Sequence, residues 1–489
     1  MSHTEATLLP LVLDKVPRGL RIALEQEGIP TCPHQTGAIS GRFLLYDSRQ
    51  VSRPMPSSGQ HPIDVDELRS FFANDPFAAL VDQRTARFAW PFAGLELHEE
   101  VARVERRDVR RELMARLRQK IERAGGVWLR LSAFPFPYRS ALNFRIDYDQ
   151  YDAADFHRTL AAIEGHEQTT SHYLSGAAYE ARPDALARLD GLDVGSHAYW
   201  HHVYRAPADN LRNVGRGIEV LRRAGIEPHG FVAPHGRFNH GLRAALEKLG
   251  VTHSSEFALA YDELPFFPPG SSVLQIPVHP VCLGLFFEAA ERRHRDSLSD
   301  HARDTVADLA ESYFQRTARA KYLAGDPVFF YGHPTGRLGR YPRVLKRVLT
   351  ELSGFAAMWP VTMSQFAAWW EARGQVQLVL RRREDQFELS CYGRGQRYRW
   401  GVEFHRGEHF ALMPVDGRVL RFSPDALVYE HVRPSTSQVE RRRDAAEPLR
   451  RRLLRWVDWE VETPLDEIDG PTWRHTAKRV LRRLRGALR

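Results

Sequence analysis

Cysteine is scarce in this chain of 489 residues, which contains only Cys32, Cys282 and Cys391. The three are far apart and form no Cys-x-x-Cys pair. Neither a disulfide framework nor a cysteine-rich zinc knuckle is therefore expected. A reducing compartment, the cytoplasm, is the expected location.

Long hydrophobic runs are also missing. No apolar run reaches the ~18–20 residues that a transmembrane helix needs. The start, MSHTEATLLPLVLDKVPRGL, lacks a basic segment followed by a long apolar stretch, so we expect no secretory signal. The motifs GxxxxGK(S/T), GxGxxG and GxSxG are absent, which leaves NTPase, dinucleotide-binding and serine-hydrolase functions without a sequence motif.

Most of the chain lacks an excess of either positive or negative charge, and one short segment is strongly basic. The formal net charge is +8, from 69 Lys and Arg against 61 Asp and Glu. Residues 471–489 carry seven of the basic side chains and no acidic one, so the remaining chain is nearly neutral. A general surface for nucleic acids is therefore not expected, and no nucleic-acid partner is predicted.

The basic segment 471–489 has the spacing of an amphipathic helix. Its apolar residues recur on one face and its cations cover the rest. Such a helix lies on anionic membranes and would hold the protein at the inner membrane face. The alternative is a C-terminal helix docked on the protein with its basic face in solvent. The apolar residues are Ala477, Val480, Leu481, Leu484 and Leu488.

Four regions are predicted along the chain. Residues 1–135 form an α/β region of unknown role, 136–373 a catalytic barrel, 374–432 a small β module and 433–489 a basic helical tail. In the first region we expect helices over 8–27 and 98–124, strands over 41–49 and 127–134, and a loop over 52–62.

The fold class is α/β, with a distorted (β/α) barrel of seven to eight strands at its centre. Short apolar segments alternate with helix-length patterns, as at 208–224, 239–249 and 300–324. Polar residues at the carboxyl ends of barrel strands are the candidates for catalysis. The expected strands are 141–149, 169–176, 192–199, 229–236, 252–259, 273–280, 326–334 and 355–361.

The first barrel strand ends in the sequence FRIDYDQ. Arg145, Asp147 and Asp149 point to the same side because side chains alternate along a strand. Buried carboxylates are costly unless they are paired or bind a metal. The alternative is that one aspartate merely caps the helix that follows.

Histidines follow the third and seventh strands. His197 and His201 are spaced i, i+4, which places both imidazoles on one face of a helical turn, while His202 points elsewhere. With one carboxylate they would form an open metal site, although isolated His pairs are commonly surface or capping residues. His333 ends a buried strand at the same rim and suits a proton donor, with a plain turn residue as the alternative.

The fourth strand ends in the turn Pro234, His235 and Gly236. Its backbone N–H groups are candidates for stabilising an oxyanion, with an ordinary loop as the alternative. Tyr199 is a candidate for stacking on a sugar, with core packing as the default. Three further histidines are expected to be buried and hydrogen-bonded: His172, His253 and His279.

Together these four ordered motifs resemble those of the polysaccharide deacetylase family, the NodB-homology carbohydrate esterases. The resemblance covers about residues 140–370 and is nearest to the branch with the lipid-linked aminoarabinose deformylases. It implies that Asp147 is the general base and that His333 protonates the leaving amine. It also implies a divalent metal ion, expected to be zinc, held by Asp149, His197 and His201.

The chain departs from the family pattern before the third motif. Val232 stands where an arginine usually precedes the third motif, and Arg145 or Arg237 is the expected substitute that orients Asp147. Glu256 is the candidate for the acidic residue expected near the fifth strand.

The resemblance implies metal-dependent removal of an acetyl or formyl group from an amino sugar, free, lipid-linked or part of a surface glycan. The partners expected are this N-acyl amino-sugar or glycan substrate and an anionic membrane. The alternatives are an amidase acting on a non-carbohydrate C–N bond and a glycan-binding barrel without turnover.

Overall fold

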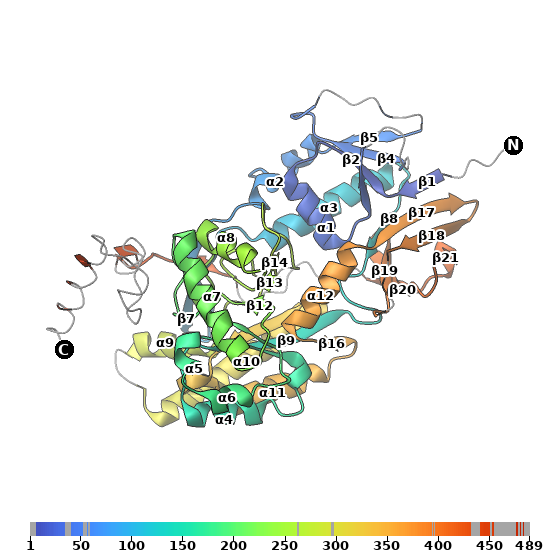
Figure 1. Ribbon diagram of the computed structural model, residues 1–489. Coiled ribbons are helices and arrows are strands. Elements are labelled where there is room, and N and C mark those ends of the chain that lie inside the picture. The colour runs from blue at the N-terminus through green and yellow to red at the C-terminus, as the bar shows by residue number, and fades with distance from the viewer. Residues whose placement is uncertain are drawn as a thin grey trace.

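The computed structural model describes most of the chain (Figure 1). It includes most of residues 1–135, most of the barrel region 136–373 and most of the β module. The described residues are 6–34, 41–51, 56, 59–261, 264–294, 298–393, 395, 397–431, 441–449, 452–453, 476–477, 480 and 483.

Eight parallel strands form the central sheet. All but β9 fall inside predicted segments, and β9 begins one residue before the segment predicted at 141–149. Seven of them run in the order β14-β13-β12-β11-β10-β9-β15, and β16 pairs with β9 beside this path. The strands are β9 (Ser140–Tyr148), β10 (Thr170–Leu174), β11 (Val194–Ser196), β12 (Gly230–Phe231), β13 (His253–Ser254), β14 (Leu274–Gln275), β15 (Val328–Gly332) and β16 (Met358–Pro360).

The sheet curls into a distorted barrel, as predicted. All nine residues of β9 are buried, and its two faces differ in character. On one face Phe144 packs edge-on against Phe314 of a covering helix. On the other, Asn143 donates from Nδ2 to Ser171 Oγ across 3.0 Å. Among the described strands no pairing joins β14 to β15, so the hydrogen-bonded ring is open there.

Helices cover the outside of the barrel between its strands (Figure 1). The three helices predicted at 208–224, 239–249 and 300–324 are confirmed as α7, α8 and α10. The covering helices are α4 (Ala153–Ala162), α7 (Pro207–Arg223), α8 (His240–Lys248), α9 (Leu283–His294), α10 (Asp300–Ala324), α11 (Pro342–Ser353) and α12 (Met363–Gly374).

The helix predicted over 8–27 is half wrong. Residues Ala6–Leu9 (β1) and Leu11–Asp14 (β2) are strands, and only Arg18–Glu27 (α1) is helical. Pro10 has no N–H to donate inside a helix, and the apolar residues beside it enter two different sheets. β2 lies in a parallel sheet with β3 (Thr31–Pro33), β4 (Phe43–Tyr46) and β5 (His61–Asp64). β4 confirms the strand predicted at 41–49.

The helix predicted over 98–124 is also wrong in its first part. Leu95–Ala102 is a strand, β7, which pairs antiparallel with β6 (Thr85–Phe92). Ala93 and Gly94 turn the hairpin with positive φ angles of 48° and 78°. The helix α3 begins only at Arg106 and ends at Arg123, before Gly125. The charged residues 98–100 made this strand look like part of a helix, and its pairing partner β6 precedes it in the sequence.

Two further sheets combine strands from the two ends of the chain. The first has the order β1-β17-β18-β21 and the second β22-β20-β19-β8. β8 (Trp128–Leu131) confirms the strand predicted at 127–134. The other strands confirm the short β segments predicted after residue 374: β17 (Gln377–Arg383), β18 (Gln386–Tyr392), β19 (Gly401–Arg406), β20 (His409–Pro414), β21 (Val419–Phe422) and β22 (Glu430–His431).

Two predictions fall largely outside the described residues. Of the loop at 52–62, residues 52–55, 57 and 58 are not described, and of the helix at 471–489 only 476, 477, 480 and 483 are, all four helical. A short strand of the tail, β23 (Arg443–Asp444), pairs with β6. Within the described residues, no helix has the length and apolarity needed to cross a membrane.

Candidate functional site

The candidate catalytic and metal-binding residues gather at the carboxyl ends of β9, β11 and β15. Asp147 lies within β9, and Asp149 follows the strand directly. His197 follows β11, and His333 follows β15. Because these strands are parallel and lie close together in the sheet, their carboxyl ends meet at one rim. The sequence predicted this convergence correctly.

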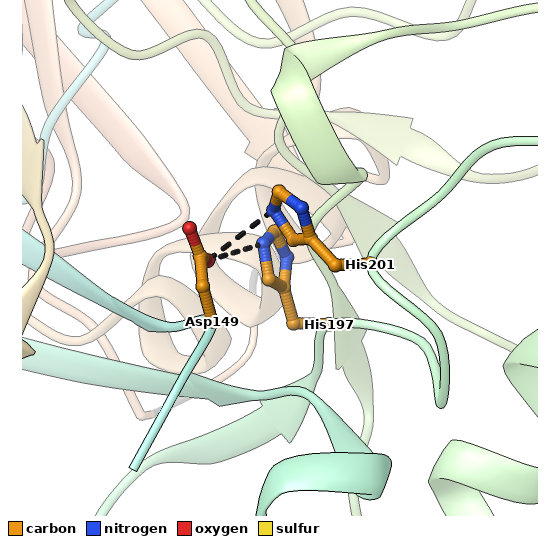
Figure 2. Close-up of side chains that lie close together, drawn as sticks. All are labelled: Asp149, His197 and His201. Carbon is orange, nitrogen blue, oxygen red and sulfur yellow. Dashed lines mark ion pairs between the residues drawn. The ribbon is translucent and has the colours of Figure 1, made fainter. Parts of the chain in front are cut away.

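Asp149, His197 and His201 form a compact cluster with the geometry of a metal site (Figure 2). Nε2 of His197 lies 3.1 Å from Asp149 Oδ1, and Nε2 of His201 lies 3.3 Å from the same oxygen. One ligand atom from each residue falls within 4.8 Å of the others. The buried Oδ1 atom has no partner in hydrogen-bond geometry. Three electron-pair donors that face one another without satisfying one another suit a divalent cation.

The tautomer of His197 is set by the backbone. Its Nδ1 atom lies 2.7 Å from the carbonyl oxygen of Val232, which can only accept a hydrogen bond. Nδ1 therefore carries the proton, and Nε2 presents its lone pair to the cluster. Val232 thus orients a candidate metal ligand through its carbonyl group.

His201 reaches the cluster through a loop and not through the predicted helical turn. Ala198 has a positive φ of 63°, which no right-handed helix allows. Asn213 of α7 anchors the loop by three hydrogen bonds. Its Oδ1 accepts from Trp200 N across 2.7 Å, and its Nδ2 donates to the carbonyls of Trp200 and His202. The i, i+4 spacing predicted the correct pair of histidines, but the helical turn assumed for it is not present. The contribution of Asn213 was not predicted from the sequence.

Arg145 holds Asp147 in place, as predicted. Its Nη2 donates to Asp147 Oδ2 across 2.8 Å, and its Nη1 donates to the carbonyl and the hydroxyl of Ser255. The guanidinium lies over the ring of Tyr331 at 4.8 Å from its centroid. Asp147 is 2% exposed and its Oδ1 has no hydrogen-bond partner. That oxygen is available to accept a proton from a ligand in the cavity.

His333 is the third histidine at the rim. Its Nε2 lies 3.5 Å from Asp149 Oδ2. Burial lowers the pKa of His333, but the charges of Asp149 and Cys282 outweigh burial and raise it to about 9. This rise depends on the charge of Asp149 and therefore describes the site without a cation. Cys282, a residue the sequence reasoning assigned no role, lines the cavity beside it.

The turn Pro234–Gly236, in which His235 has a positive φ of 59°, brings His235 against the candidate metal ligands. The ring centroid of His235 lies 4.5 Å from that of His201. The predicted oxyanion contact is wrong for Gly236, because its N–H donates to the Ala233 carbonyl across 2.9 Å. Gly236 has a φ of +59°, and a Cβ there would meet the Phe257 ring at 2.4 Å. The turn places His235 and does not supply this donor.

A cavity of about 480 Å³ lies above these residues, and most of the predicted site lines it. Two of the predicted substrate contacts do not. Pro234 is buried and is not part of the lining. Tyr199 donates its hydroxyl to Glu180, and the guanidinium of Arg216 lies over its ring at 3.6 Å from the centroid. The substrate contact predicted for Tyr199 is therefore wrong, and its default of packing holds. The predicted residues in the lining are Arg145, Asp147, Asp149, His197, His201, His235, Gly236 and His333.

The lining also contains residues that sequence reasoning missed. Glu99 and Glu100 come from β7 in the first region of the chain, and Glu288 comes from α9. Glu99 and Glu100 lie in the segment that was predicted as helix. His202, predicted to point elsewhere, also lines the cavity, as does Arg237. Recognising 85–92 and 95–102 as the two strands of a hairpin would have placed the two glutamates on a strand and not on a helix.

Glu256 lies outside the cavity lining, behind the strand ends. It is fully buried, and it accepts hydrogen bonds from Ser254 Oγ and Gln275 Nε2. Burial raises the pKa of Glu256 to about 7, although these hydrogen bonds and Arg145 oppose the shift. Its position is that of a support for the residues around Arg145.

The three remaining histidines are buried and hydrogen-bonded, as predicted. His172 contacts Tyr148, His253 contacts Tyr173 and His279 contacts Tyr313, each through a phenol oxygen. Burial lowers the pKa of His172 to about 4 and that of His279 to about 3. They are neutral parts of the core.

Comparison with known proteins gives matches among solved structures only. No family model and no curated protein matches the chain. The chain is 17% identical to a protein from Mycobacterium smegmatis assigned as a polysaccharide deacetylase, over 50% of this chain and 94% of that one, with a TM-score of 0.41. It is 16% identical to a family 4 carbohydrate esterase from Streptomyces lividans solved with acetate, over 47% of this chain and 95% of that one, with a TM-score of 0.31.

A third match is a CE4 family pseudoenzyme from Bacillus anthracis, with 12% identity, 48% and 70% coverage of the two chains and a TM-score of 0.32. The similar structures thus include polysaccharide deacetylases, the family whose motifs the sequence resembles. The likeness to the aminoarabinose deformylase branch stays a prediction. The chain is similar over about half of its length to this group of carbohydrate esterases and deacetylases.

Proposed function

We propose that this chain is a metal-dependent hydrolase that removes an N-acyl group from an amino sugar, free or within a glycan. The observation that carries the proposal is the pairing of an open metal site with an unpartnered buried carboxylate oxygen, Asp147 Oδ1, in one cavity. Two histidines and one aspartate leave coordination positions for water and substrate. Zinc is the expected ion, since imidazole and carboxylate ligands suit it.

The protein's residues divide the proton transfers between them. A divalent cation at Asp149, His197 and His201 would supply Lewis acidity to the acyl carbonyl and to the attacking water. Asp147 accepts the proton of that water on Oδ1, while Arg145 orients the carboxylate by donating to Oδ2. His333, which lines the same cavity beside Asp149, donates a proton to the departing nitrogen. The products are a carboxylate and an amine.

A screen for released acid tests this function. The zinc-loaded chain is incubated with nucleotide-linked, lipid-linked and polymeric amino sugars that carry acetyl or formyl groups, and released acetate and formate are measured. We expect release from at least one class, retention of the metal but loss of hydrolysis in Asp147→Asn, and loss of the metal in His197→Ala. His157→Ala, an exposed histidine on α4, is the matched control.

Each negative result has a distinct meaning. Full activity of Asp147→Asn would remove Asp147 as the base, and full activity after removal of all bound metal would remove the metal mechanism. Release only from acylated amines without a sugar would favour the amidase alternative. Zinc binding without release from any acylated substrate would favour the glycan-binding alternative.

A separate proposal concerns location. We propose that the chain is cytoplasmic and that residues 471–489 bind the inner membrane face through their seven basic side chains. Deleting 471–489 should abolish sedimentation of the protein with vesicles containing anionic lipid. Unchanged sedimentation would contradict the membrane role and favour a helix docked on the protein.

A further inference from the structure

His333 is followed by a short loop at the rim of the cavity, residues 334–339, called here the His333 loop. The backbone of this loop closes on itself. The N–H of Leu338 donates to the carbonyl of His333 across 3.0 Å, and the N–H of Gly339 donates to that of Pro334 across 2.9 Å. These two bonds fix the shape of the loop. Its place relative to the metal ligands depends on contacts with the rest of the barrel.

Asp155, in the first turn of α4, contacts the middle of the His333 loop. Its Oδ2 atom accepts a hydrogen bond from the N–H of Gly336 across 2.6 Å. The residue is 6% exposed. A hydrogen bond to a carboxylate is about twice as strong as one between neutral groups. Asp155 therefore ties the loop to a helix of the barrel wall.

Arg158, three residues further along α4, supports Asp155 and contacts the end of the loop. Its Nη2 donates to Asp155 Oδ1 across 2.5 Å, and its Nε donates to the carbonyl of Gly339 across 2.7 Å. The packing is close there, since a Cβ on Gly339 would lie 2.4 Å from Asp155 Cα. Because the Arg158 side chain is 52% exposed, its ion pair contributes less than the buried contact of Asp155.

The His333 loop is also joined to the strand end that carries a candidate metal ligand. Thr335 Oγ1 donates to the carbonyl of Gln150 across 3.2 Å. Gln150 directly follows Asp149, whose Oδ2 lies 3.5 Å from His333 Nε2. All four residues line the cavity. A displacement of the loop therefore changes the distance between the imidazole of His333 and the metal site.

We propose that Asp155 is a positioning residue for proton transfer, which holds the His333 loop so that the imidazole of His333 reaches the departing nitrogen. The inference rests on the proposed hydrolysis. In that reaction the amide C–N bond breaks, the oxygen of water joins the acyl carbon, and His333 gives a proton to the nitrogen. Asp155 itself lies outside the cavity lining, so it acts only through the loop.

The test compares kcat of the zinc-loaded chain for an N-acetyl amino sugar with kcat for 4-nitrophenyl acetate. The nitrogen of the amide needs a proton as it leaves, whereas 4-nitrophenolate leaves as a stable anion. In Asp155→Ala, kcat for the amide should fall about 10–100-fold. The kcat for the ester and the bound zinc should stay at wild-type values. Asp155→Asn keeps an oxygen that accepts from Gly336, and its kcat for the amide should lie between those of Asp155→Ala and wild type.

A double variant separates a positioning role from a general structural one. His333→Ala should lose amide hydrolysis and keep ester hydrolysis. Adding Asp155→Ala to it should lower kcat for the amide no further, because both changes act through one imidazole. The matched control is Asp184→Ala, at an exposed aspartate in the first turn of α6 (Pro183–Ala187), which should keep both wild-type rates.

Three results would overturn the proposal. They are an unchanged kcat for the amide in Asp155→Ala, equal losses for the amide and the ester, and additive losses in the double variant. If the wild type hydrolyses the amide but not the ester, the double variant decides alone.

If the wild-type chain hydrolyses neither compound, the proposed hydrolysis fails and the role of Asp155 is judged from the loop itself. Hydrogen exchange measured by mass spectrometry on a peptide covering 334–339 should then be faster in Asp155→Ala, by about 10-fold at Gly336, because a bond to a charged acceptor is lost. Asp184→Ala should exchange as the wild type does. Unchanged exchange in Asp155→Ala would overturn the positioning role independently of turnover.

Discussion

Arg145 reaches along its own strand to hold Asp147, with 2.8 Å between its Nη2 and Asp147 Oδ2. Two residues apart on β9, the two side chains share the inner face of the barrel. The pair is buried, and Ser255 and Tyr331 fix the guanidinium from two other strand ends. Asp147 is therefore positioned by the strand that carries it, and the arginine absent at Val232 is not needed for this contact.

Replacing Arg145 by lysine should lower kcat while leaving metal binding unchanged. Lysine keeps the charge but cannot contact Ser255 and Asp147 together, because it lacks the planar fork of donors. A displacement of the base by about 1 Å can cost ~100-fold in rate. The measurements are kcat and bound zinc. Arg216→Lys, at a stacked arginine outside the cavity, should keep the wild-type kcat. A wild-type kcat in Arg145→Lys would show that the orientation of Asp147 has another source.

Much of the barrel could be predicted from the sequence for a simple physical reason. Parallel strands buried on both faces form apolar runs, and their carboxyl ends must meet at one rim. Asp149, His197 and His333 could therefore be expected to lie together without knowledge of any distance. Their convergence follows from chain topology, which the alternation of strands and helices encodes.

The wall formed by β7 could not be predicted in this way. Glu99 meets the cavity only because its hairpin docks on α9, almost 190 residues away in the sequence. The strand has charged residues on both faces, since one side borders a polar cavity. That composition matched a helix better than a strand. Such contacts depend on how segments distant in the sequence pack together, and the local spacing of apolar residues does not predict that packing.

Tyr199 and Asn213 show the same limit on a smaller scale. Both belong to the support of the loop that carries His201. Tyr199 is aromatic and near the site in sequence, yet its side chain turns outward to Glu180. Asn213 is unremarkable in a helical pattern, yet it bonds three backbone groups of the loop. The loop also contains Ala198 with a positive φ of 63°, which the sequence did not indicate.

Asn213→Ala should weaken metal binding although Asn213 is not one of the three residues that would bind the metal. The change removes three hydrogen bonds that hold residues 200–202, so His201 loses its fixed position. Loss of such outer contacts typically lowers metal affinity by about 10–100-fold. Competition with a zinc chelator of known affinity measures the effect. Arg212→Ala is the control on the same helix, because Arg212 pairs with Asp209 on the surface of α7. Equal zinc affinities of Asn213→Ala and wild type would contradict the role of Asn213.

Zinc should raise the melting temperature of the chain. A ligand that binds only the folded state stabilises it by about 2.7 kcal/mol when its free concentration is 100 times Kd. Scanning calorimetry with and without zinc measures the shift, and a chelator should reverse it. His197→Ala should show no shift, whereas His157→Ala should show the wild-type shift. A zinc-dependent shift that survives in His197→Ala would mean that the stabilising ion binds elsewhere.

Glu256→Gln should stabilise the protein above neutral pH and alter how stability depends on pH. Burial raises the pKa of Glu256 to about 7 in the folded chain, above the value of 4.5 expected when it is exposed. Between these two values the folded state binds more protons than the unfolded state. The contribution of Glu256 to the free energy of unfolding therefore falls as pH rises from about 4.5 to 7 and stays low above it.

Glutamine has no charge to bury. Its Oε1 can accept from Gln275 Nε2, and its Nε2 can donate to Ser254 Oγ, so both contacts can be kept. The difference in unfolding free energy between variant and wild type should grow by about 2–3 kcal/mol from pH 5 to pH 8, an upper figure from the size of the shift. Urea unfolding at a series of pH values measures it, and taking the difference cancels the opposite contribution of the buried histidines. A difference that stays constant across this range would mean that Glu256 is already ionised in the folded barrel, and Arg145 would then have to be its counter-ion as well as that of Asp147.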